Sequence, residues 1–343
     1  LGAVGGVAAW SVHRHLKGSG EGPPALTLAM APYQDLAMIV NAPPLGYDRR
    51  HGVKLELATV GWEDILPAVA SASRGVHVGF GSLAEYLAKE RNLNSGAGDP
   101  IRFCCPLYVF KGGGFISMDP EVPTLTNAAV SDRARVASFL RHRIGAQRHS
   151  VYEMVLYSLA RRTGFPTNEL HITDIQLNDG LLATQGHSLD IAAAGLTQTT
   201  EALRTGGRVV LTMDDLGFAD LTGFICRDST LRNRRNEVLG LIRAWFDSVD
   251  YVYRDLRANS RESLAYLRRT AATQYTFEEY ERALSQEYLP RTTSEAKGAF
   301  LSSEGRFSIA RIADDMADYL QNIRGIRGLP VADLQLGALL RDA

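Results

Sequence analysis

LTLAMAPYQDLAMIV, at residues 26–40, decides the fold, because an apolar stretch passes through a polar loop at 33–35 into a second apolar stretch. The same order recurs in VKLELATVGWEDILPAV at 53–69 and in VHVGFGSLAEYL at 76–87. Each first part predicts a short strand, and each last part has the apolar spacing of a helix. Three successive strand, loop and helix units predict an α/β protein with mostly parallel sheets.

Later segments repeat this order and predict a second lobe. Residues 101–118 form a long apolar segment, broken by Gly112-Gly113-Gly114, which predicts a strand that passes between lobes with a flexible backbone at the glycines. An amphipathic helix is expected after Ser150, with its end near Gly164. The further expected elements are strands at 171–177, 189–194, 209–213 and 223–226, a short helix at 180–184, and mostly helices from 231 to 320.

These elements predict a chain that builds one lobe, then a second, and then returns to the first. The predicted boundaries are residues 26–112 plus 217–343 for the first lobe and residues 113–216 for the second. Two hinge segments, near 110–114 and 217–223, are expected to join them.

The composition is that of an ordinary globular protein. The 343 residues are 45% hydrophobic and 22% charged, enough for a sizeable core and two domains. Lys and Arg number 37 against 38 Asp and Glu, which leaves a net charge of -1. This balance disfavours a nucleic-acid partner, because no basic field would attract a polyanion.

The three cysteines do not have the spacing of a metal site. Cys104 and Cys105 are adjacent, so their side chains point to opposite faces of an extended segment, and Cys226 is distant in sequence. Buried free thiols are the simpler interpretation. A disulfide from Cys226 to either neighbour is the alternative in an oxidising compartment.

Residues 1–25 are interpreted as the remnant of a signal peptide or membrane anchor, followed by a linker. The first ten residues are apolar and small, and a stretch rich in Gly, Ser and Pro follows at 18–24. The apolar run is too short to span a bilayer by itself. A retained anchor would hold the protein on the outer face of the cytoplasmic membrane, and a disordered tail is the alternative.

Candidate ligand-binding residues lie in the loops that precede the predicted helices. Open α/β sheets bind ligands at the carboxyl ends of their strands, where helix N-termini present unpaired N–H groups. Tyr33 and Trp62 are suited to stacking on a flat ligand, and Arg148 is suited to pairing with a carboxylate, sulfonate or phosphate. The candidates are Tyr33, Gln34, Asp35, Trp62, Gly81 and Ser82 in the first lobe, and Gln147, Arg148, His149, Ser150, Gly195 and Thr197 in the second.

These candidates also have structural interpretations. Asp35, Ser82 and Ser150, taken singly, are better explained as helix N-caps. The two aromatic residues are equally suited to packing at the edge of a lobe, and Arg148 and His149 to an exposed surface. The chain contains no Gly-x-Ser-x-Gly elbow, no His-Glu-x-x-His and no dinucleotide glycine fingerprint. We therefore predict a binding protein without catalytic residues, metal or cofactor.

The order of segments resembles a known family at residues 26–33, 45–47, 52–56, 78–82, 145–150, 188–192 and 225–228. This family comprises the solute-binding proteins of nitrate, sulfonate and taurine-type ABC importers, with their relatives that bind thiamine-pyrimidine precursors. The resemblance implies a type II periplasmic-binding-protein-like fold, with a helical C-terminal part and two α/β lobes joined by two hinges. His77 departs from the usual Asp, and residues 131–143 replace the usual Gly-Lys segment.

The function that the resemblance implies is a periplasmic protein that closes on a small organic or oxyanion ligand and presents it to an ABC permease. One alternative is an accessory subunit of a membrane assembly that keeps the fold without using its cleft. A second alternative is a pyrimidine-synthesising enzyme of the same fold, which would use a cluster of His and Cys. Only residues 103–105 hint at such a cluster.

Overall fold

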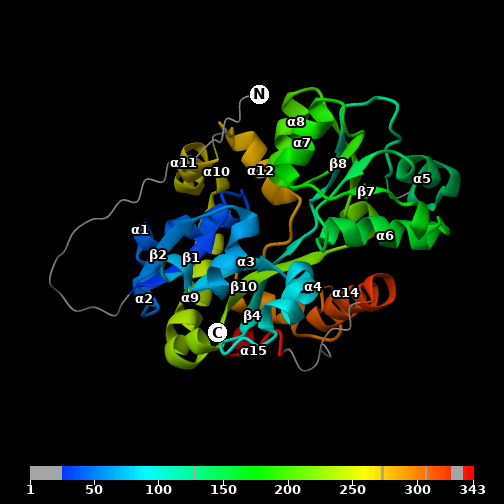
Figure 1. The fold of residues 1–343 in the computed structure, drawn as a ribbon. Helices are drawn as coiled ribbons and strands as arrows, with labels where there is room; N and C mark the ends of the chain where they lie inside the picture. Colours follow the sequence, from blue (N-terminus) through cyan, green and yellow to red (C-terminus); the bar gives the residue numbers. More distant parts are fainter. Residues whose placement is uncertain (1–24, 127–128, 272–273, 306, 326–334) are drawn as a thin grey trace, which may run out of the picture.

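Two five-stranded sheets form the cores of two lobes (Figure 1). The computed structural model describes residues 25–126, 129–271, 274–305, 307–325 and 335–343. Within these ranges no helix is both long and apolar enough to cross a membrane. The predicted signal or anchor remnant lies, except for Ala25, outside the described residues.

Both sheets have the same strand order. The first consists of β1 (Leu26–Met30), β2 (Leu55–Thr59), β3 (Val78–Ser82), β4 (Ile101–Phe110) and β10 (Asp220–Arg227), in the order β2-β1-β3-β10-β4. The second consists of β5 (Gly114–Ser117), β6 (Ile144–Gly145), β7 (Ile172–Thr173), β8 (Ile191–Ala194) and β9 (Arg208–Thr212), in the order β7-β6-β8-β5-β9. In each sheet the fourth position is held by the strand that arrives from the other lobe.

This exchange of strands makes the sheets mixed rather than mostly parallel as predicted. β1 pairs in parallel with β2 and β3, whereas β10 is antiparallel to both β3 and β4. In the second sheet β6 is parallel to its neighbours, and β5 is antiparallel to β8 and β9. A strand that enters from the other lobe runs against the strands that the lobe builds itself. The predicted two-lobed α/β architecture is confirmed with this one difference.

Helices follow the strands and cover both sheets. Those before the first crossing are η1 (Leu36–Asn41), α1 (Ala42–Leu45), α2 (Tyr47–Arg50), α3 (Trp62–Ala70), η2 (Ser73–Gly75) and α4 (Leu83–Asn94). Those of the second lobe are η3 (Ala129–Ser131), α5 (Arg133–Leu140), α6 (Val151–Thr163), η4 (Thr167–Glu169), α7 (Leu177–Gln185), α8 (Leu196–Arg204) and η5 (Asp214–Leu216). Those after the return are α9 (Asp228–Arg254), α10 (Leu256–Asn259), α11 (Arg261–Thr270), α12 (Phe277–Ser285), α13 (Thr293–Phe300), α14 (Ile309–Arg324) and α15 (Ala338–Asp342).

Local signals in the sequence explain several of these boundaries. The side chain of Ser150 caps α6, and Gly164, with φ of 73°, ends it, as predicted. The strand predicted at 171–177 is shorter, because α7 already begins at Leu177 and only Ile172 and Thr173 pair with β6.

The first lobe is built around Trp245 of the long helix α9. Its side chain is fully buried. Its ring centroid lies 5.4 Å from that of Phe80 in β3 and 6.1 Å from that of Tyr108 in β4. Burial of such large aromatic surfaces is a main source of stability for a domain. The α9 helix therefore fixes the two strands whose ends approach the second lobe.

The chain crosses between the lobes twice, from β4 to β5 and from β9 to β10. The first crossing spans residues 111–113 and the second spans residues 213–219. The first crossing is held by the buried carboxylate of Glu287, which accepts hydrogen bonds from the backbone N–H groups of Lys111 at 2.7 Å and Gly112 at 3.0 Å. Burial raises the pKa of Glu287 well above its usual range. The C-terminal helical part thus fixes the first hinge.

Gly112-Gly113-Gly114, where we predicted a flexible backbone, is closely packed. None of the three has a positive φ. A Cβ on Gly112 would lie 2.6 Å from Cβ of Gln286, and one on Gly113 would lie 2.6 Å from the ring of Phe110. A Cβ on Gly114 would overlap the Leu211 carbonyl and approach Thr212 Cα to 2.8 Å. Glycine is required here because β5 and its surroundings leave no room for a side chain.

The three cysteines are buried free thiols, on β4 and β10. The sulfur of Cys226 lies 2.7 Å from that of Cys104, whereas the Cys105 thiol donates to the carbonyl of Pro106. Of the two cysteines considered as disulfide partners of Cys226, Cys104 is therefore the one that lies next to it.

Candidate functional site

A small cavity of about 60 Å³ lies between the lobes. Its walls combine the ends of β3, β4 and β10 with the starts of α3, α6, α7 and α8. The residues that line it are Tyr33, Asp35, Trp62, Ser82, Glu85, Tyr108, Phe110, Gln147, Val151, Tyr152, Leu177, Gly195, Leu196, Gln198, Asp220 and Thr222. This is the place where open α/β sheets bind ligands.

An aromatic pair forms one side of the cavity. The rings of Tyr33 and Trp62 are stacked, with centroids 5.9 Å apart and planes inclined by 29°. The indole Nε1 of Trp62 donates to Oε1 of Glu85 at 2.9 Å, so the orientation of the ring is fixed. Burial, reinforced by the neighbouring carboxylate of Glu63, raises the pKa of Tyr33. Tyr33 therefore presents a neutral hydroxyl and a flat ring.

Asp35 is buried and hydrogen-bonded on both carboxylate oxygens. Oδ1 accepts from the backbone N–H of Leu36 at 3.0 Å, and Oδ2 accepts from the Tyr108 hydroxyl. Asp35 is thus an N-cap of η1, as its structural interpretation predicted, and also part of the cavity wall. Burial raises the pKa of Asp35, although the hydrogen bond from Tyr108 acts against this effect.

Asp220 is the second buried acid, at the start of β10. Its Oδ1 accepts hydrogen bonds from the backbone N–H groups of Ala84 at 3.1 Å and Leu221 at 2.7 Å. Its Oδ2 accepts a hydrogen bond from the hydroxyl of Ser82. Ser82 also caps α4 by accepting from the Glu85 N–H at 3.1 Å. Burial raises the pKa of Asp220 to about 7, against these stabilising hydrogen bonds.

The charge character of the wall limits the ligands that it can hold. Asp35, Glu85 and Asp220 all line the cavity, and no Lys, Arg or His is among the described residues that do so. An anion placed here would meet carboxylates and tyrosine hydroxyls without a compensating cation, at a high desolvation cost. The wall suits a neutral or positively charged group that donates hydrogen bonds.

Six of the twelve sequence candidates line the cavity, and they come from both lobes. They are Tyr33, Asp35, Trp62, Ser82, Gln147 and Gly195. Gln34 and Thr197 do not line the cavity but join the lobes directly, since the Thr197 hydroxyl donates to Oε1 of Gln34 at 3.0 Å. The amide Nε2 of the fully buried Gln34 has no hydrogen-bond partner among the residues that the structure describes.

The other four candidates do not line the cavity. Arg148 is more than half exposed and pairs with Asp174, whose Oδ2 is 3.9 Å from Arg148 Nε and whose Oδ1 accepts from the Arg148 backbone N–H at 2.9 Å. His149, with φ of 60°, donates its backbone N–H to Glu153, and Ser150 donates to the Gln147 carbonyl. Gly81 packs against Ile225. The predicted anion partner, Arg148, is therefore a surface residue.

Several wall residues were missed by the sequence analysis. Tyr108 and Asp220 lie inside or at the start of strands, and Tyr152 lies within a helix, so none is in a loop before a helix. For Asp220 the sequence held one signal, which is an acidic residue within the hinge segment predicted at 217–223. The cysteines at 104 and 105 are on β4 but do not line the cavity. No group of three or more His, Cys, Asp or Glu within the described ranges is placed to hold a metal ion.

Comparisons with known proteins reveal similarity at the level of structure. No protein-family model and no curated protein sequence matches the chain. Among solved structures, the ligand-binding component of an ABC-type import system from Staphylococcus aureus, with zinc bound, has a TM-score of 0.67 at 11% identity, over 93% of this chain and 98% of that one. The alkanesulfonate-binding protein SsuA from Xanthomonas axonopodis pv. citri, bound to MOPS, has a TM-score of 0.65 at 13% identity, over 92% and 99%.

An enzyme shares the same architecture. The desulfurization enzyme DszB has a TM-score of 0.60 at 14% identity, over 92% of this chain and 98% of that one. Fold alone does not decide between binding and catalysis. The strand order, the two crossings and these similarities together show that the chain has the two-lobed fold of the periplasmic solute-binding proteins of ABC importers.

Proposed function

We propose that the protein is an extracytoplasmic solute-binding protein whose lobes close on a small organic molecule for an ABC permease. The observation that carries this proposal is the wall of the interlobe cavity, where the stacked Tyr33 and Trp62 face buried carboxylates. Closure about two hinges needs no bond chemistry, since a ligand shifts the population toward the lobe arrangement that it binds better. Retention at the membrane through residues 1–25 remains a prediction.

The sequence left two ligand classes open, a small organic molecule and an oxyanion, and the same wall favours the first. We infer a flat organic molecule with an amine or other hydrogen-bond donor, in place of an oxyanion. The aromatic faces attract a cation, and the carboxylates of Asp35 and Asp220 accept its hydrogen bonds. Binding a cation would favour the ionised carboxylates, so affinity is expected to rise as the pH increases toward about 7, the pKa of Asp220.

A matched set of probes tests this inference. Benzylamine, benzyl alcohol and benzenesulfonate share one ring and differ in charge. We expect benzylamine to raise the melting temperature of the purified protein in a concentration-dependent way, and benzenesulfonate to have no such effect. Stabilisation by benzenesulfonate through the interlobe cavity would contradict the inferred ligand class.

The role of the aromatic pair is tested by substituting Trp62. We expect Trp62→Ala to weaken benzylamine binding about fivefold, because loss of one aromatic face removes roughly 1 kcal/mol. Trp62→Phe keeps a ring while it removes the hydrogen bond to Glu85, so it should retain most of the affinity. Isothermal titration measures both variants, and equal affinity for Trp62→Ala and the unsubstituted protein would overturn the role of this pair.

One observation favours the accessory-subunit alternative. The cavity of about 60 Å³ is far below the roughly 300–1,000 Å³ of typical ligand sites. The lobes also contact each other directly through Gln34 and Thr197. A binding protein must open this contact to admit its ligand. If no amine or neutral ring stabilises even a Thr197→Ala variant, in which this contact is removed, the accessory role is the better account.

A further inference from the structure

Cys104 and Cys226 form a pair of buried thiols on the neighbouring strands β4 and β10. Their exposed fractions are 4% and 0%. The two sulfur atoms lie 2.7 Å apart, closer than the roughly 3.5–4.0 Å at which non-bonded heavy atoms usually pack. A disulfide bond is about 2.05 Å long. The strands therefore hold the two sulfurs where little further approach would join them.

A β-bulge explains why Cys104, and not the adjacent Cys105, is the neighbour of Cys226. Cys105 pairs with Phe224 of β10, and Cys104 is the extra residue of the bulge that precedes this pair. A bulge redirects the side chain of its extra residue. The Cys105 thiol donates to the carbonyl of Pro106, 3.3 Å away. The local register thus singles out one pair among the three cysteines.

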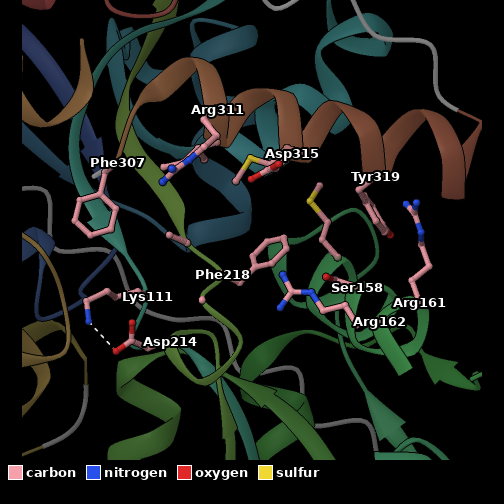
Figure 2. Close-up of a pocket in the computed structure, with 15 residues that line it drawn as sticks. Lys111, Ser158, Arg161, Arg162, Asp214, Phe218, Phe307, Arg311, Asp315 and Tyr319 are labelled. Carbon is pink, nitrogen blue, oxygen red and sulfur yellow. Dashed lines mark hydrogen bonds and ion pairs between the residues drawn. The ribbon is translucent and has the colours of Figure 1, made fainter. Parts of the chain in front are cut away.

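The same two strands carry both crossings between the lobes. The first crossing leaves the end of β4, and the second leads into the start of β10. Figure 2 shows Lys111 of the first crossing paired with Asp214 of the second, beside a cavity of about 640 Å³ between α6 and α14. This ion pair is 3.0 Å long and partly exposed, so it contributes little stability. Movement of the second sheet relative to the first therefore acts on β4 and β10.

The ladder between β4 and β10 benefits from a further connection. β4 is the last strand of its sheet, and two register shifts interrupt its pairing with β10. The two cysteines are 122 residues apart in sequence. The segment between them contains all five strands of the second sheet and both crossings. A bond that closes so long a loop restricts the unfolded chain and stabilises the folded one.

We propose that Cys104 and Cys226 form a disulfide bond in an oxidising compartment, which joins the two strands that carry the crossings. The oxidant is a second disulfide. One cysteine thiolate attacks it and expels a thiolate, and the other cysteine then attacks the mixed disulfide and expels the second thiolate. The cysteines lose two electrons and two protons, and the oxidant becomes two thiols. Formation of the bond in the cell rests on the extracytoplasmic location in the proposed function.

The burial of the pair determines when the bond forms. Burial raises the pKa of the Cys226 thiol well above its usual range, so the folded protein holds a neutral thiol there. Thiol–disulfide exchange requires the thiolate and access to the oxidant. We therefore expect the bond to form while the chain folds, before the sheet covers the sulfurs.

Refolding in a glutathione buffer tests the proposal on the full chain. The reduced, unfolded protein is refolded with oxidised and reduced glutathione, unfolded again, and alkylated with iodoacetamide. Trypsin, which cleaves after Lys and Arg, separates residues 103–111 from residues 209–227. We expect these two peptides to remain linked without a reductant and to carry one alkyl group, on Cys105. Three alkylated cysteines, or a link through Cys105, would overturn the proposal.

The adjacent cysteines provide matched variants. Cys104→Ala and Cys226→Ala should abolish the link between the two peptides, whereas Cys105→Ala should retain it. A cooperative melting transition verifies that each variant is folded. A link that persists in Cys104→Ala, or is lost in a folded Cys105→Ala, would contradict the assigned pair.

The stabilising effect is measured on the unsubstituted protein. The linked form should melt about 5 °C above the reduced form, because the bond closes a long loop. An equal or lower melting temperature of the linked form would refute the stabilising role. These measurements use no ligand, so failure of benzylamine to bind would count against the proposed function and leave the disulfide result intact.

Discussion

Replacing Gly114 by alanine is expected to lower the free energy of unfolding by about 3 kcal/mol or more. The new Cβ would overlap the Leu211 carbonyl and approach Thr212 Cα to 2.8 Å. Both obstacles are backbone atoms of β9, so a rotamer change cannot relieve them, and β5 must separate from β9. Urea unfolding followed by circular dichroism measures the loss.

Gly98→Ala is the matched control for this substitution. Gly98 lies in the loop before β4, and an added Cβ there would meet no atom within 4 Å. We expect its stability to stay within about 0.5 kcal/mol of the unsubstituted protein. If Gly114→Ala were as stable as Gly98→Ala, the glycine triplet would be explained by flexibility, as we predicted from the sequence, and not by close packing.

The second large effect concerns the pH dependence that Asp220 imposes on stability. Its pKa is raised from 3.8 to about 7 in the folded protein, so the folded state holds a proton between these values that the unfolded state has released. Stability therefore decreases as the pH rises through this interval and is constant above it. At about 1.4 kcal/mol per pH unit, the ionisation of Asp220 costs about 4 kcal/mol in all.

Asp220→Asn removes this titration. The amide is uncharged, and its oxygen can accept from the N–H groups of Ala84 and Leu221 as Oδ1 of Asp220 does, while its NH₂ group takes the place of Oδ2 beside the Ser82 hydroxyl. When the pH is raised from about 5 to 8, the free energy of unfolding should fall in both proteins. We expect the fall to be roughly 2–3 kcal/mol smaller in the variant than in the unsubstituted protein. Asp35 and Glu287 also have raised pKa values, so the variant should retain part of the slope.

An exposed carboxylate provides the comparison. Asp132 caps α5 at the surface by accepting from the N–H groups of Ala134 and Arg135. Asp132→Asn is the same substitution at an exposed helix cap outside the interlobe cavity, and it is the control. Urea unfolding at several pH values compares the variants, and parallel curves for Asp220→Asn and the unsubstituted protein would show that the buried acid does not titrate as described.

The sequence candidates that line the interlobe cavity lie at strand ends or helix starts. Tyr33 and Trp62 follow β1 and β2 directly, and the ends of neighbouring parallel strands meet at one edge of a sheet, so chain order alone brings them together. Asp220 and Tyr108 could not be found in this way. They reach the cavity because β10 arrives from the other lobe and inserts between β3 and β4, a pairing that no local pattern encodes.

The same distinction explains why we propose an organic ligand in place of the oxyanion that the sequence also left open. A sequence shows that Arg148 precedes a helix, but not that it pairs with Asp174 and does not line the interlobe cavity. It likewise shows Arg161 and Arg162 on one helix and Arg311 on another, far along the chain. Only the packing of α14 against α6 makes them walls of one cavity.

The sequence by itself determined the two-lobed α/β architecture, the main helices and strands, and the polar loops at strand ends. These depend on periodicity, caps and turns, which act over a few residues. The tertiary structure decided the mixed sheets, the close packing at the glycine triplet, the acidic character of the interlobe cavity and the walls of the cavity between α6 and α14. Each of these depends on contacts between segments distant in sequence, where burial and close approach determine the charge, the shape and the space that a ligand meets.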